Sequence, residues 1–81
     1  MTMKVDIYTR PQCPLCDDTK RILTNHNLDY TEHIIGIDIT RDEVLDKFPG
    51  ASLLPLVLLD DVWVGGRNEL SKILRERQTN V

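Results

Sequence analysis

The chain has 81 residues, of which 41% are hydrophobic and 28% are charged, and its formal net charge is −3. This length predicts one domain over residues 1–81, and the composition is ordinary for a soluble globular protein. Acids and bases are interspersed and the longest apolar run is far too short to span a bilayer, so we expect neither nucleic acid nor a membrane as a partner.

The first half of the chain predicts a strand, a helix and a second strand. Residues 3–9 form the first expected strand, in which Val5 and Ile7 alternate with polar residues. Residues 14–26 follow with apolar side chains at helical spacing. Residues 30–35 form the second strand, and this strand–helix–strand order predicts a right-handed parallel crossover.

A capping box predicts the start of the second helix. Thr40 is expected to cap the first turn, while Glu43 reaches back to the backbone of Thr40. Val44, Leu45 and Phe48 follow at helical spacing and predict the buried face of this helix.

The last third of the chain predicts a hairpin and a final helix. Pro55 opens a buried strand, Asp60-Asp61 forms the turn, and residues 62–64 return as an antiparallel strand. Asn68 is expected to cap the last helix, whose inner face holds Leu70, Ile73 and Leu74. The order β-α-β-α-β-β-α predicts an α/β fold with one mixed sheet flanked by three helices.

The two cysteines, Cys13 and Cys16, lie between the first strand and the first helix. Pro14 fits the first helical position, and the free backbone N–H groups and the dipole of the helix favour Cys13 as a thiolate. No export signal precedes them, so we expect a reducing cytoplasm, where such a pair is catalytic or metal-binding. A Cys-X-X-Cys in a βαβ context predicts thioredoxin-like redox chemistry.

Zinc binding is the main alternative for the cysteine pair. A structural zinc site needs four ligands, and only Cys13, Cys16, His26 and His33 are available. Their spacing does not match that of a zinc finger. We therefore expect no metal, and we interpret the histidines as an ordinary helix-end residue and a strand surface residue.

Two carboxylates directly follow the cysteine pair. Asp17 and Asp18 favour the first turn of the helix, but their charge opposes a thiolate at Cys13. Lys20 and Arg21 lie one turn further on and are expected to offset this effect.

Four motifs in register resemble the glutaredoxin family over essentially the whole chain. Cys13-Pro14-Leu15-Cys16 is similar to the dithiol active site, and Arg10 lies where the family usually has a basic residue. Leu53-Leu54-Pro55 lies where the family has Thr-Val-Pro with a cis proline. Gly65-Gly66-Arg67-Asn68-Glu69-Leu70 resembles the element that holds glutathione. The resemblance implies a thioredoxin-like fold.

The resemblance also implies a glutathione site around Cys13. Arg10 is expected to pair with the glycine carboxylate, and the start of the last helix to receive the γ-glutamyl carboxylate. The backbone of Leu54, next to Pro55, is expected to pair with the ligand main chain as an added strand does. The complete expected set is Arg10, Leu54, Pro55, Gly66, Arg67, Asn68 and Glu69.

The implied activity is that of a monomeric, cytoplasmic dithiol glutaredoxin. Cys13 attacks a substrate disulfide, Cys16 resolves the mixed disulfide, and glutathione reduces the resulting Cys13–Cys16 bond. Glutathione is a co-substrate, no permanently bound cofactor is implied, and the partners are disulfide-containing proteins, with ribonucleotide reductase as a candidate.

Two other functions stay open at this point. The first is a thioredoxin- or NrdH-like electron donor that a flavoprotein reductase reduces. The second is an iron–sulfur cluster carrier in which Cys13 of two chains and two glutathiones hold the cluster. The element beginning at Gly65-Gly66 argues against the first, and the presence of Pro14 and Cys16 argues against the second.

Overall fold

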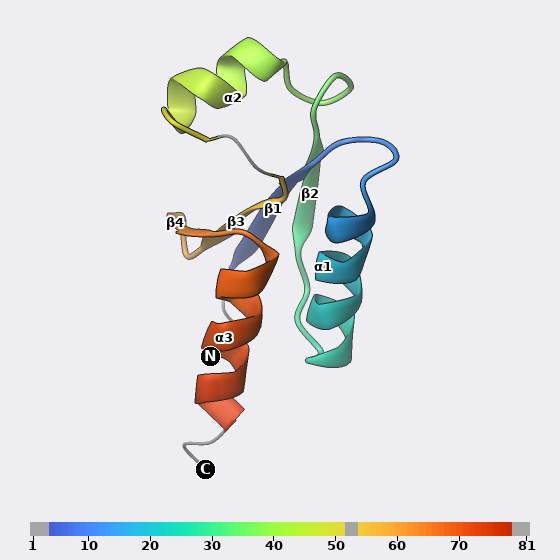
Figure 1. The fold of residues 1–81 in the computed structure, drawn as a ribbon, viewed down its shortest axis with the longest axis vertical. Coiled ribbons are helices and arrows are strands. Elements are labelled where there is room, and N and C mark those ends of the chain that lie inside the picture. Colours follow the sequence, from blue (N-terminus) through green and yellow to red (C-terminus); the bar gives the residue numbers. More distant parts are fainter. Residues whose placement is uncertain (1–3, 52–53, 79–81) are drawn as a thin grey trace.

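The computed structural model describes residues 4–51 and 54–78 and contains a four-stranded mixed sheet (Figure 1). The strands are β1 (Val5–Thr9), β2 (Thr31–Ile34), β3 (Leu56–Leu59) and β4 (Val62–Gly65), and their order in the sheet is β2-β1-β3-β4. β1 pairs with β2 in parallel, and β3 pairs with β1 and β4 in antiparallel fashion. The expected mixed sheet and hairpin are therefore confirmed.

Three helices cover the two faces of this sheet. α1 (Pro14–Asn25) and α3 (Arg67–Gln78) lie against each other on one face, and α2 (Arg41–Lys47) lies across the other face (Figure 1). The order β-α-β-α-β-β-α matches the prediction. In the described residues, none of these helices is both long and apolar enough to cross a membrane.

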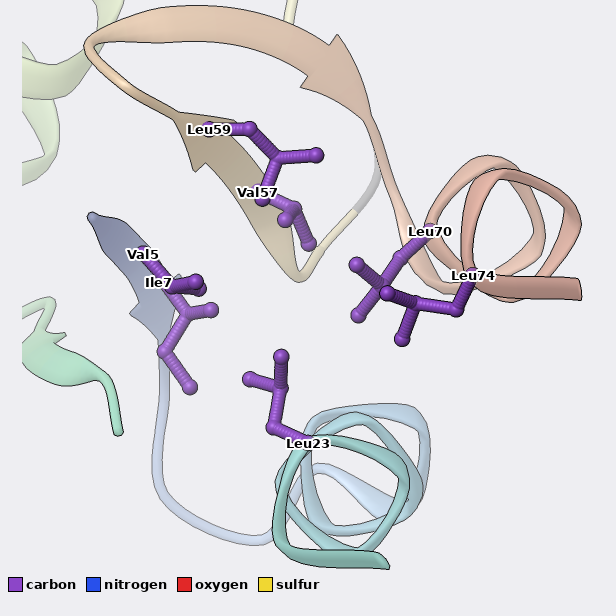
Figure 2. Close-up of a cluster of buried hydrophobic side chains, with 7 residues drawn as sticks. All are labelled: Val5, Ile7, Leu23, Val57, Leu59, Leu70 and Leu74. Atoms are coloured by element: carbon purple, nitrogen blue, oxygen red, sulfur yellow. The ribbon is translucent and has the colours of Figure 1, made fainter. Parts of the chain in front are cut away.

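The larger core lies between the sheet and the pair α1 and α3 (Figure 2). Alternate residues of a strand point to the same face, so β1 and β3 each supply two side chains to it. These meet leucines from the inner faces of both helices, in a cluster of Val5, Ile7, Leu23, Val57, Leu59, Leu70 and Leu74. The cluster fixes α1 and α3 relative to the sheet, and with them the two helix starts that border the site.

The smaller core lies under α2 and uses the other face of the same strands. Tyr8, Leu56 and Leu58 pack there with Val44, and Phe48 packs against them half-buried. The capping box of Thr40 is present, as predicted. Leu45 was expected in this face but is 40% exposed, because a helix of only two turns presents a narrow stripe to the sheet.

The last helix begins two residues earlier than the sequence suggested, because a cap at Asn68 implies Glu69 as the first helical residue. Arg67 is its first residue, so Asn68 lies inside α3 and the prediction that Asn68 caps it is wrong. Instead the Oε1 atom of Glu69 accepts a hydrogen bond of 2.7 Å from the backbone N–H of Gly66. A side chain three residues into the helix thus satisfies a backbone donor that precedes it.

Candidate active site

Cys13 caps the N-terminus of α1. Its backbone is extended, with φ −118° and ψ 102°, and its Sγ accepts a hydrogen bond of 3.2 Å from the backbone N–H of Cys16. Pro14 occupies the first turn, where it removes no helical hydrogen bond. A sulfur in this position receives both a donor and the positive end of the helix dipole, and both favour its thiolate form.

The two cysteines form a disulfide whose Cα atoms lie 5.2 Å apart. This separation is within the ordinary range for such a bond, so the first turn of α1 accommodates the bridge without rearrangement. Cys13 is 7% exposed and Cys16 only 1%. Cys16 is therefore the more buried of the two, as the sequence predicted.

The carboxylates after the cysteine pair are matched by cations, as expected. Asp17 lies 3.6 Å from Lys20, and Asp18 lies 3.7 Å from Arg21. Lys20 also lies 3.1 Å from Glu32 of β2, and the hydrogen bond between them raises the pKa of Lys20 above its ordinary value. Most of the negative charge beside the thiols is thus compensated locally.

The loop before β3 approaches the start of α3 closely. The Leu54–Pro55 peptide bond is cis, as the family resemblance implied. A Cβ atom on Gly66 would lie 3.1 Å from the carbonyl oxygen of Pro55, and one on Gly65, which has φ +135°, would lie 2.8 Å from Cβ of Glu69. The absence of a side chain at Gly66 therefore lets the two segments meet, and at Gly65 it leaves room for the Glu69 side chain.

A cavity of about 300 Å³ lies at this junction. It is bordered by six of the residues expected to bind glutathione, namely Leu54, Pro55, Gly66, Arg67, Asn68 and Glu69. These come from two segments that lie eleven residues or more apart in the chain, and the packing of α3 against β3 brings them together.

A second cavity of about 610 Å³ adjoins the first. Arg10 and Cys13 line it, and it shares four residues with the first cavity, namely Leu15, Ala51, Leu54 and Leu56. Eight of the nine predicted site residues therefore border this pair of cavities, and the ninth, Cys16, is buried in α1 bonded to Cys13.

Several side chains at the start of α3 already have partners. The Oδ1 atom of Asn68 accepts a hydrogen bond of 3.2 Å from Nη1 of Arg67. The carboxylate of Glu69 accepts one from the backbone N–H of Gly66. The Nε atom of Arg67 is buried without a hydrogen bond and lies 3.8 Å from the carboxylate of Asp18. An anion at this helix start would therefore meet mainly backbone N–H groups and a partly neutralised arginine.

Two residues of the cavities were not singled out from the sequence. Arg41, the first residue of α2, lines the second cavity, and Trp63 of β4 lines the first. Trp63 also makes an edge contact with Phe48, with ring centroids 5.6 Å apart, so it both packs against the end of α2 and borders the cavity. No sequence motif marks either residue, because their place at the site depends on how α2 and the hairpin cross the sheet.

The histidines lie away from the cysteine pair's cavity. His33 is on β2, where Nε2 lies 3.0 Å from the Asp6 carboxylate and the ring stacks on Tyr8. His26 immediately follows α1. Across residues 4–51 and 54–78, no three or more histidine, cysteine or acidic side chains gather as metal ligands would.

The fold and the paired cysteines define a thioredoxin-like protein with a redox-active cysteine pair. The solved glutaredoxin 1 of Francisella tularensis, complexed with cacodylate, has a TM-score of 0.81 to this chain at 29% identity, and the match covers 96% of this chain and 99% of that one. The Glutaredoxin family model matches residues 5–64. The chain belongs to the glutaredoxin family.

This chain is also similar to curated proteins of different lengths. Glutaredoxin 3 of Escherichia coli K12 is 29% identical over 66 residues, which cover 82% of this chain and 80% of that protein. The hybrid peroxiredoxin hyPrx5 of Haemophilus influenzae is 32% identical over 68 residues, 84% of this chain. The match spans only 28% of the hybrid peroxiredoxin.

Proposed function

We propose that this protein is a glutathione-dependent thiol–disulfide oxidoreductase that uses Cys13 and Cys16 as a redox pair. One observation carries the proposal: the more accessible sulfur caps a helix at the edge of a cavity, while its partner is buried one turn further on. This arrangement favours attack by Cys13 and resolution by Cys16.

The reaction transfers two electrons from the dithiol to a substrate disulfide. The Cys13 thiolate attacks one substrate sulfur, forms a mixed disulfide and releases the other substrate sulfur as a thiolate, which takes up a proton. Cys16 loses its proton and attacks Cys13, which releases the second substrate thiol and leaves the Cys13–Cys16 disulfide. Two glutathiones then reduce this bond in the same two steps and become glutathione disulfide.

The charges of glutathione match the two ends of the paired cavities. Arg10 lines the second cavity with Cys13, which supports it as the proposed partner of the glycine carboxylate. The backbone N–H groups at the start of the twelve-residue α3 suit the γ-glutamyl carboxylate. Leu54 borders both cavities, and its backbone is the proposed partner of the peptide part of the ligand. The proposed reaction requires no permanently bound cofactor.

The partners follow from this chemistry. Disulfide-containing proteins and glutathione mixed disulfides are the proposed substrates, with ribonucleotide reductase as one candidate protein. We propose that the protein acts as a monomer, because one chain supplies both cysteines and both cavities. The proposed compartment is the cytoplasm, where a cysteine pair is kept reduced.

A coupled assay tests the reductant directly. The protein, glutathione, glutathione reductase and NADPH should together reduce a small mixed disulfide, whereas thioredoxin reductase should not replace the glutathione system. Turnover with thioredoxin reductase alone would contradict glutathione dependence and favour the electron-donor function. A visible absorption band in anaerobically purified protein would instead favour the cluster carrier.

Titration of glutathione into the Cys16→Ser protein tests the site. Amide resonances of Leu54, Gly66 and Asn68 should shift together with those near Cys13. Shifts limited to the Cys13 loop would contradict the proposed groove.

A further inference from the structure

Two arginines beside Cys13 have no anionic partner among the residues that the structure describes. Arg10 and Arg41 both line the second cavity, and no carboxylate borders that cavity. In the described part of the chain, neither arginine lies within ion-pair distance of an acidic side chain, whereas Lys20, Arg21 and Arg67 are each paired. Although the net charge is −3, the entrance to the nucleophile is locally positive.

Helix stability does not explain Arg41. As the first residue of α2, it places a cation at the end of the helix where the dipole disfavours one. Its exposed side chain makes no stabilising ion pair in residues 4–51 and 54–78 that would offset this effect. Of these two arginines the glutathione assignment uses Arg10, so Arg41 provides a second positive charge at this cavity that the assignment leaves unused.

The cavity also has an apolar border open to solvent. Leu15 is 50% exposed and Leu45 is 40% exposed, and both line the cavity with the two arginines. Aliphatic side chains beside two cations complement a segment that carries an acidic residue together with an apolar one.

We propose that this cavity selects protein disulfides in which an acidic residue lies within two positions of the attacked cysteine. This inference rests on the proposed redox function and names the substrate class of the same site. Consecutive Cα atoms are 3.8 Å apart, so a carboxylate one or two residues from a sulfur bonded to Cys13 is still at the cavity lined by Arg10 and Arg41.

The expected preference is moderate. Exposed ion pairs contribute little individually, so two cations acting on one carboxylate should favour the acidic substrate by about three- to tenfold in the second-order rate constant. The preference should fall at high salt, where exposed charges are screened.

The experiment uses three peptides that differ at one residue next to a single cysteine, which is Asp, Asn or Lys. Each peptide is linked as a mixed disulfide to mercaptoethanol and is reduced by the pre-reduced protein without glutathione, and the released peptide thiol is quantified by chromatography. The protein dithiol supplies both electrons. We expect the Asp peptide to react about three- to tenfold faster than the Asn peptide and the Lys peptide to react slowest.

Matched variants identify the residues responsible. Arg10→Gln with Arg41→Gln should bring the ratio of the Asp to the Asn rate close to one. Lys47→Gln removes the same charge from the exposed end of α2 outside the cavity, and it should leave the ratio unchanged. Because Arg41 opposes the dipole of α2, its replacement should not destabilise that helix.

Each result of the peptide experiment tests a different part of the proposal. Equal rates for the Asp and Asn peptides, or a ratio that survives in the double variant, would overturn the proposed selectivity. Reduction of none of the peptides would contradict the redox function itself. Reduction of the peptides without any turnover in the glutathione assay would contradict only glutathione dependence.

Discussion

Replacement of Asp17 and Asp18 by asparagine should lower the pKa of the Cys13 thiol in the reduced protein. Both carboxylates lie within two residues of Cys16, near the helix end where negative charge collects when Cys13 ionises. Their removal leaves the helix dipole and the nearby cations to stabilise the thiolate with less opposition.

The structure limits the size of this effect. A charge near an exposed helix terminus contributes about 0.3–1 kcal/mol, which corresponds to about 0.2–0.7 pKa units for each carboxylate. Asp17 is 69% exposed, and both carboxylates already face cations at 3.6–3.8 Å. We therefore expect a combined decrease of about half a unit.

The assay is the pH dependence of iodoacetamide alkylation of Cys13 in a Cys16→Ser background, at low and high salt. The decrease should shrink at high salt because the interaction is screened. Asp29→Asn with Asp46→Asn removes the same charge from exposed positions outside the cavities and should change the pKa much less. A Cys13 pKa that rises in the Asp17 and Asp18 variant would refute the electrostatic reasoning and indicate that the carboxylates act through the helix they stabilise.

Three further predictions concern the two cysteines, Gly65 and one ion pair. Cys13→Ser should abolish all disulfide reduction, whereas Cys16→Ser should lose reduction of protein disulfides and keep deglutathionylation, and loss of both activities in Cys16→Ser would contradict these roles. Gly65→Ala should lower the free energy of unfolding by more than about 1 kcal/mol in denaturant titrations. The φ angle of Gly65 is positive, and a Cβ there would collide with the Glu69 side chain. The Lys20–Glu32 pair should contribute fully to stability below pH 10.5, the ordinary pKa of Lys20. Its contribution should be lost as the pH rises through the raised pKa that Lys20 has in the folded protein. Unfolding curves of Lys20→Met should show a weaker dependence on pH in this range.

The sequence by itself determined the elements and the reactive end of α1. Hydrophobic spacing identified the strands and helices, the Thr40 capping box identified the start of α2, and Cys13 was identified as the residue before Pro14 that meets free backbone donors. These features depend on residues within one turn or one strand, so local spacing is sufficient to predict them.

Only the tertiary structure decided which surfaces meet at the site. Arg41 lies 28 positions after Cys13 in the chain, yet it lines the same cavity because α2 packs across the sheet. Asn68 does not cap α3, because Glu69 bonds the Gly66 backbone instead and the chain approaches Pro55 closely at that point. Such contacts join segments that are distant in the sequence, and they depend on the relative positions that the two hydrophobic cores impose on the helices.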